Sequence, residues 1–200
     1  IEQQQDDAAG IRAFQKAHDL APNDAGIAGQ LAELLFRNEM LEEAKEIYHR
    51  VAGALAARQD AKALCQTSYR LAYIEEKLGN AAVALEHYRQ AFAADPTYLP
   101  ALEGLATALL RAEAWDEAQR VLQAILVHHR DRLTESEVVD LEAQLAEMDV
   151  RQGDPEKGRA QLERILAAHP SHPACLRQMA GLEEALQRWE RAYGFLCRLA

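Results

Sequence analysis

The chain has 200 residues, a formal net charge of −10 and a hydrophobic fraction of 49%. This acidic balance argues against a non-specific nucleic-acid binder or a protein held on anionic membranes, because both need a basic surface. No apolar run approaches the ~18 residues of a membrane span, so direct membrane insertion is not predicted. The chain contains 39 alanines and only three serines, a composition that favours helices over strands.

The cysteines predict free thiols. Cys65, Cys175 and Cys197 are an odd number, and they fall at apolar positions of helical patterns. Buried thiols behave as small hydrophobic groups, so no disulfide framework is expected. This usage fits a reducing compartment and favours a cytoplasmic location. A periplasmic location stays open, because the sequence begins inside a helical pattern and is expected to be a piece of a longer chain.

The predicted helices follow one another in pairs. The first, from about Asp7 to Leu20, lacks a partner before it. The clearest pair lies in residues 65–98, where apolar residues recur with helical spacing on both sides of Gly79-Asn80. That dipeptide predicts a turn, and Asp95-Pro96 ends the pair because proline lacks a backbone donor.

A 34-residue pattern places alanine or glycine at positions 8 and 20 of each pair, where two helices cross most closely. The pattern predicts a half repeat followed by five repeats. Their ranges are 1–24, 25–58, 65–98, 99–132, 139–172 and 173–200. The prolines at 22, 96 and 170 recur every 74 residues, which indicates a period of two repeats.

Two insertions, 59–64 and 133–138, account for the longer period. Thr134 and Glu137 form a capping-box pattern, so the insertion is expected to lengthen a helix and not to form a loop. The expected lengthened helices run from about Asp60 to Leu78 and from Thr134 to Gln152.

These residues resemble the tetratricopeptide repeat family: a 34-residue helix-turn-helix with small residues at positions 8 and 20, a large residue at 24 and proline at 32. The family's tryptophan near position 4 is missing throughout, and alanine replaces glycine at position 8. The resemblance implies an all-α fold, a right-handed α-α superhelix forming a single solenoid domain over residues 1–200. The alanine- and arginine-rich composition favours a bacterial source.

No catalytic motif is present, and no cofactor is expected. The sequence lacks a nucleophile elbow, a phosphate-binding glycine loop and a His-Glu-x-x-His motif. His169, His172 and Cys175 have the spacing of metal ligands but lack a fourth ligand, so a metal site is not predicted. The protein is therefore predicted not to be an enzyme.

The resemblance implies that positions 2, 5, 9, 12 and 13 of each first helix face a concave groove. Position 13 carries four cations that could hold an acidic peptide. These are Arg37, Lys77, Arg111 and Arg151. The alternative is that they only complement helix dipoles, because each ends a first helix.

Further candidate groove residues are aromatic or apolar. Tyr69 and Tyr73 lie four residues apart on one helix face, and Phe36 and Leu110 occupy position 12. Packing between helices is the alternative role. The lysine and asparagine with which chaperone adaptors of this family hold a C-terminal tail are missing, so that activity is not expected.

The leading hypothesis is a non-enzymatic scaffold or adaptor that binds a peptide or protein segment in its groove. One alternative is the regulatory or targeting arm of a larger enzyme. Another is a self-assembly module, because the last helix presents an apolar face that nothing after it covers. Its residues are Tyr193, Leu196, Cys197 and Leu199.

Overall fold

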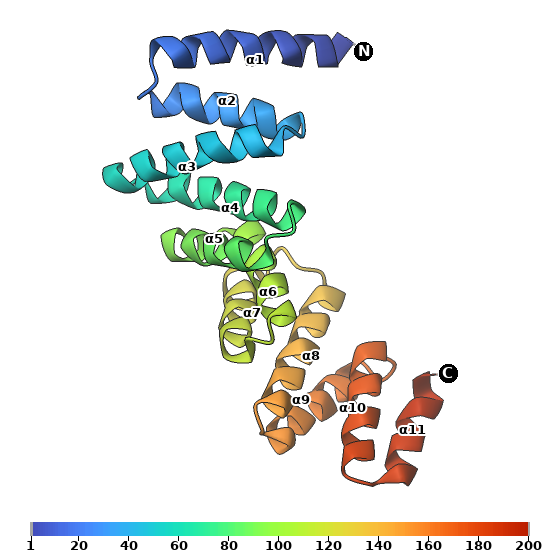
Figure 1. Ribbon diagram of the computed structural model, residues 1–200. Coiled ribbons are helices and arrows are strands. Elements are labelled where there is room, and N and C mark those ends of the chain that lie inside the picture. Colours follow the sequence, from blue (N-terminus) through green and yellow to red (C-terminus); the bar gives the residue numbers. More distant parts are fainter. Residues whose placement is uncertain (1, 200) are drawn as a thin grey trace. The chain divides into compact units, whose positions relative to one another are not determined.

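The computed structural model describes residues 2–199, with side chains from Ala8 onward. These residues form eleven α-helices and no strand (Figure 1). The helices are α1 (Glu2–Leu20), α2 (Ala25–Arg37), α3 (Leu41–Arg58), α4 (Ala61–Lys77), α5 (Ala81–Ala94), α6 (Leu99–Arg111), α7 (Trp115–His129), α8 (Glu135–Arg151), α9 (Pro155–Ala168), α10 (Pro173–Ala185) and α11 (Trp189–Leu199). None of the helices in the described residues is long and apolar enough to cross a membrane.

The chain divides into two compact units. The N-terminal unit extends to Ala108 and the C-terminal unit begins at Leu109, so α6 belongs partly to each. In the N-terminal unit each helix from α1 to α5 packs on the next one along the chain (Figure 1). In the C-terminal unit α7 to α11 pack in the same consecutive order. The repeat boundaries and the single domain stay predictions.

Local sequence signals fix where the helices begin and turn. The Asp24 carboxylate accepts hydrogen bonds from the Gly26 and Ile27 N–H groups, which caps α2. Gly79, after α4, has φ of 83°, a conformation that glycine adopts without steric cost. Gly153, after α8, has φ of 93°. The predicted turn at Gly79-Asn80 is confirmed.

The small residues lie at the helix crossings, as the pattern predicts. Ala32 and Ala44 are fully buried between α2 and α3, and Ala72 is fully buried in α4. A Cβ added to Gly158 of α9 would come within 2.5 Å of the Ala146 carbonyl oxygen of α8. At this crossing the two backbones are too close even for alanine.

Two first helices are longer than the others. α4 and α8 have 17 residues each, whereas α2, α6 and α10 have 13. Asp60 caps α4, and Thr134 and Glu137 form a complete capping box at the start of α8. The observed bounds agree with both predicted lengthened helices.

Candidate functional site

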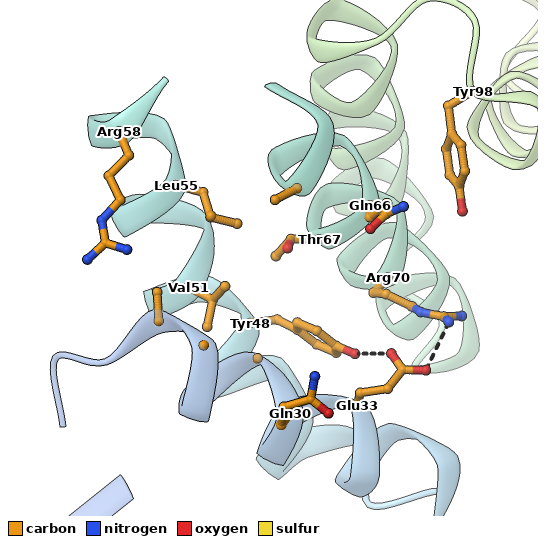
Figure 2. Close-up of a pocket in the computed structure, with 14 residues that line it drawn as sticks. Gln30, Glu33, Tyr48, Val51, Leu55, Arg58, Gln66, Thr67, Arg70 and Tyr98 are labelled. Carbon is orange, nitrogen blue, oxygen red and sulfur yellow. Dashed lines mark hydrogen bonds and ion pairs between the residues drawn. The ribbon is translucent and has the colours of Figure 1, made fainter. Parts of the chain in front are cut away.

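A groove of about 560 Å³ lies between α2, α3 and α4 of the N-terminal unit (Figure 2). Two glycines of α2, Gly26 and Gly29, line it, and no atom lies within 4 Å of a Cβ added to Gly29. The helix backbone is therefore open to the groove there. Gln30, Gln66 and Tyr98 also line it, so hydrogen-bonding groups surround an open stretch of backbone.

A fixed hydrogen-bond network lies at one side of this groove (Figure 2). The Tyr48 hydroxyl donates to Glu33 Oε2 at 2.8 Å, and Arg70 Nη2 donates to Glu33 Oε1 at 3.0 Å. Burial of the phenol, together with the bond to Glu33, raises the pKa of Tyr48. Tyr48 therefore remains a donor at neutral pH and holds the Glu33 carboxylate in position for Arg70.

Aromatic rings and cations extend from this network. The Arg70 guanidinium carbon lies 4.7 Å from the Phe36 ring centroid and 6.0 Å from that of Tyr69. Phe36 and Tyr73 meet edge to face at 5.5 Å, and Lys77 Nζ lies 5.3 Å from the Tyr73 ring. Four of the predicted groove residues, Phe36, Tyr69, Tyr73 and Lys77, thus form one cluster with Arg70, called here the aromatic–cation cluster.

Tyr69 joins this cluster to the core. Its ring lies 5.8 Å from Tyr98 and 6.2 Å from the buried Tyr88. Burial raises the pKa of Tyr69. Tyr69 therefore packs against two other tyrosines, and its neighbour Tyr98 lines the groove. A role of Tyr69 in binding stays a prediction.

The residues of the predicted cation ladder are divided between the two units. Arg37 and Lys77 are exposed at helix ends in the N-terminal unit, whereas Leu110 and Arg111 lie in the other unit. Arg151, also there, bonds to Glu147 at 2.7 and 3.0 Å. Its guanidinium carbon lies 4.7 Å from the Trp115 ring. Arg151 is thus held by α7 and α8, and the four-residue ladder stays a prediction.

Sequence reasoning missed Arg70 and the role of Glu33. Arg70 occupies position 6 of its repeat, which the family pattern does not place among the groove positions. The available signal was an acid at position 9 of one repeat followed by arginine at position 6 of the next. Only the stacking of α4 beside α2 and α3 brings these side chains together.

The three residues with metal-ligand spacing have other partners. His172 Nδ1 accepts a hydrogen bond from the Cys175 N–H at 3.5 Å, and His172 Nε2 lies 3.3 Å from Asp140. His169 Nε2 lies 3.7 Å from Glu135. Within the described residues, no cluster of three or more His, Cys, Asp or Glu side chains is arranged to hold a metal ion.

Comparison with known proteins identifies the repeat. Models of the tetratricopeptide repeat family match residues 77–145 and 139–182, which together span just over half of the chain. No curated protein matches the sequence significantly.

Solved structures with the same fold are distant in sequence. One is YrrB, described as a TPR protein with an unusual peptide-binding site. Its sequence is 17% identical, the TM-score is 0.68, and the match covers 94% of this chain and 91% of the YrrB chain. Another is MamA (41-end) from Desulfovibrio magneticus, with 14% identity and a TM-score of 0.61; the match covers 87% of this chain and 92% of the MamA chain. A tetratricopeptide repeat protein from Parabacteroides merdae has 16% identity and a TM-score of 0.57; the match covers 98% of this chain and 73% of that protein's chain. These likenesses confirm the predicted all-α repeat fold, and with the family matches they show that the chain belongs to the tetratricopeptide repeat family.

Proposed function

We propose that this protein is a non-enzymatic adaptor whose N-terminal groove binds an extended peptide segment carrying a carboxylate. Tetratricopeptide repeat proteins are in general non-catalytic scaffolds that bind proteins or peptides, and helical repeats offer concave surfaces for this purpose. The observation that carries the proposal is the juxtaposition of a fixed arginine, Arg70, with open helix backbone at Gly29 in one groove. Its volume lies within the roughly 300–1,000 Å³ of ligand sites.

Gly29 supports binding because its presence in the helix has no packing reason. Glycine inside a helix costs roughly 0.5–1 kcal/mol relative to alanine. A Cβ at Gly29 would meet no atom within 4 Å, so the fold itself does not require glycine there. The missing side chain leaves room for a peptide to approach the backbone of α2.

Arg70 supplies the anchor for an acidic group. A guanidinium has five N–H donors, and the described bond to Glu33 comes from Nη2 alone. Contacts with Phe36 and Tyr69 hold the guanidinium in place, so little further side-chain entropy is lost when it binds. Arg58 also lines the groove, which gives an acidic ligand a second cation.

The test uses peptides selected from a random phage-displayed library on the wild-type protein, with affinities then measured by fluorescence polarisation. Gly29→Leu fills the groove and is expected to weaken binding at least tenfold while making the helix more stable. Gly53→Leu is the matched control: Gly53 is an exposed glycine of α3 whose Cβ would also meet nothing within 4 Å, and it does not line the groove. It should raise stability similarly and leave the affinity unchanged.

Arg70→Gln tests the anchor. It should weaken wild-type binding and abolish the difference between a selected peptide and its Asp→Asn or Glu→Gln counterpart. Reversing the charge of Arg37 and Lys77 separately tests the predicted ladder through the salt dependence of binding. Selected peptides that bind Gly29→Leu and the wild type equally would place binding outside this groove and refute the proposal.

A further inference from the structure

A second pocket, of about 420 Å³, lies where α1 ends, α2 begins and the second half of α3 passes them (Figure 1). It is separate from the groove of the proposed function, with which it shares only Ala25 and Val51. Most of its wall is apolar, and four polar side chains line it. They are His18, Asn23, Asp24 and Arg50. This volume, and an apolar wall with a few polar groups, are typical of small-molecule sites.

His18 is a buried imidazole in this pocket. It is 8% exposed, and its Nδ1 has no hydrogen-bond partner. Burial of a polar group without a hydrogen bond is costly. His18 also lies in the last turn of α1, where a positive charge suits the helix dipole, but that role does not require burial. The buried ring therefore points to a ligand in the pocket.

The repeat pattern makes a polar residue at this place unusual. His18 occupies position 28, which is apolar in the next four repeats. The residues there are Ala52, Phe92, Leu126 and Leu166. Leu166 shows the packed form of this position, because it is buried in an apolar cluster of the C-terminal unit. His18 is thus not required by the packing of the fold.

Arg50 offers an available cation at the same pocket. Arg50 and Arg198 occupy the same repeat position, and Arg198 Nη2 donates a hydrogen bond to the Pro170 carbonyl oxygen. Pro22 is the residue that corresponds to Pro170, yet Arg50 makes no hydrogen bond or ion pair with any residue that the structure describes. All five N–H donors of its guanidinium can therefore turn to a ligand.

Asp24 offers an anion. Its Oδ1 accepts both capping hydrogen bonds, from the Gly26 and Ile27 N–H groups, so Oδ2 keeps its full acceptor capacity. Asp24 and Arg50 line one pocket but form no ion pair with each other. A ligand that carries both charges would satisfy both side chains.

We propose that this pocket binds a free α-amino acid in its zwitterionic form. The ligand carboxylate pairs with Arg50 and accepts a hydrogen bond from His18 Nε2, because the other ring nitrogen is closed off. The ligand ammonium group donates to Asp24 Oδ2, and its side chain lies on the apolar wall. A residue inside a peptide chain has neither terminal charge, so the occupant differs from the peptide proposed for the groove.

The test measures binding of the twenty standard free L-amino acids to the isotope-labelled protein by NMR. At least one should shift the amide resonances of His18, Asn23 and Arg50 in a saturable way. The same amino acid should stabilise the protein in urea unfolding, by about a hundredfold in the equilibrium constant at a free concentration near one hundred times Kd.

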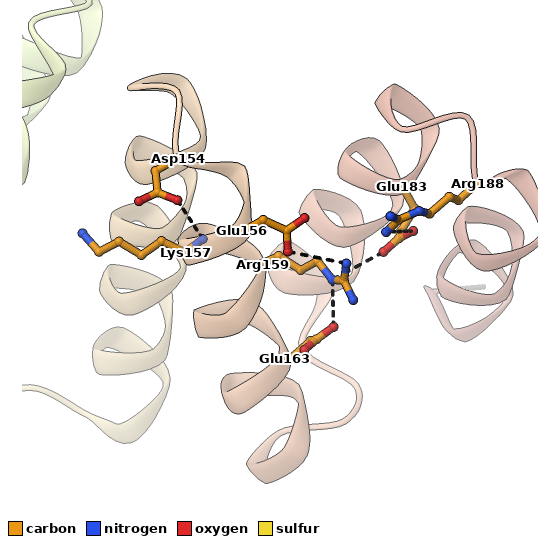
Figure 3. A network of polar contacts seen from close by, with 7 residues as sticks. All are labelled: Asp154, Glu156, Lys157, Arg159, Glu163, Glu183 and Arg188. Carbon is orange, nitrogen blue, oxygen red and sulfur yellow. Dashed lines mark hydrogen bonds and ion pairs between the residues drawn. The ribbon is translucent and has the colours of Figure 1, made fainter.

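Asp24→Asn tests the ammonium contact without loss of the cap, because asparagine caps helices as well as aspartate does. It should weaken binding about tenfold or more, as expected for a hydrogen bond to a charged group. It should also abolish the preference for the amino acid over its N-acetyl derivative. Asp154→Asn is the matched control, since Asp154 caps α9 through the Lys157 N–H at 3.1 Å in the other unit (Figure 3). It should leave the affinity unchanged.

Two variants test the other contacts. Arg50→Gln should weaken binding and abolish the preference for the amino acid over its carboxamide. His18→Leu places at position 28 the side chain that Leu166 has there, so it should abolish binding and raise the stability of the free protein. A purely structural histidine would affect stability alone.

Three results would overturn the proposal. If none of the twenty amino acids shifts the resonances of the pocket, it holds only water. Equal affinities for an amino acid, its N-acetyl derivative and its carboxamide would refute recognition of the two charges. Binding that His18→Leu leaves unchanged would place the ligand elsewhere on the protein.

Discussion

Gly158→Ala separates what the repeat pattern predicts from what the packing predicts. Position 20 is alanine in the other full repeats, so the pattern alone predicts that alanine is tolerated at Gly158. Helix propensity alone would make the change stabilising by about 1 kcal/mol. In the structure the new Cβ would lie 2.5 Å from the Ala146 carbonyl oxygen and 2.5 Å from Val150 Cγ2. The Ala146 oxygen belongs to the helix backbone, so relief requires α8 and α9 to separate.

Overpacking of this kind typically costs 1–3 kcal/mol. The net effect of Gly158→Ala is then a loss of about 0–2 kcal/mol. Gly181→Ala in α10 is the matched control in the same unit, because its Cβ would meet nothing within 4 Å, and it should gain about 1 kcal/mol. The two variants should therefore differ by about 1–3 kcal/mol, or roughly 2–12 °C in Tm for a chain of this size.

The assay is urea and thermal unfolding followed by circular dichroism at 222 nm. The informative quantity is the difference between the two variants, because both gain the same helix propensity. Equal stabilisation by Gly158→Ala and Gly181→Ala would show that the helices separate at little cost and would refute the close crossing of α8 and α9.

Two further predictions concern titratable groups. Burial raises the pKa of Cys65 and of Cys175 to about 11, whereas Cys197 is exposed. At pH 8 a disulfide reagent such as dithiobis-nitrobenzoate should therefore modify Cys197 rapidly, and Cys65 and Cys175 only after the protein is unfolded in urea. Rapid reaction of all three in the folded protein would contradict the burial. Hydrogen bonds from Thr134 lower the pKa of the Glu137 carboxyl in the folded protein below its usual value near 4.3. The ionised carboxylate therefore adds stability above that pH, and this stability is lost as the pH falls through the pKa of the folded state. The stability difference between wild type and Glu137→Gln should therefore shrink on acidification below about pH 4, and a difference that persists at pH 2 would be inconsistent with this capping box.

The sequence predicted the parts of this fold that depend on local or steric rules. The turn at Gly79-Asn80 depends on the conformational freedom of one glycine. The start of α8 depends on two side chains three residues apart, Thr134 and Glu137. Small residues at helix crossings depend on size alone, which a period of 34 residues displays directly.

The candidate site depended on contacts that no local rule specifies. Arg70 meets Glu33 across 37 residues of sequence, and Tyr48 meets it from a third helix. Their pairing depends on how α2, α3 and α4 pack together and on which side-chain rotamers of Glu33, Tyr48 and Arg70 this packing allows. The bond between Arg151 and Glu147 is different, because a charge pair four residues apart on a helix was readable from the sequence.

At three contacts between repeats a donor on the second helix meets a buried carboxylate on the next first helix: Lys45 with Glu75, Gln119 with Asp149 and Arg159 with Glu183. These donor–carboxylate pairs limit how an array of this kind can change its length. Loss of residues 25–58 by recombination would set α4 directly after α1, and Glu75 would then face Ile11, which now lies in an apolar cluster with Leu35. Glu75 would keep the 2.7 Å hydrogen bond from Asn80 Nδ2 but lose the nearby charge of Lys45, which destabilises a buried carboxylate. Loss of residues 65–138 instead sets α8 after α3 and keeps donor and acceptor matched, because Lys45 would then face Asp149. Loss of residues 139–172 also keeps a match, because Gln119 would then face Glu183, so the pairs restrict which helices can be joined and not the number of repeats exchanged.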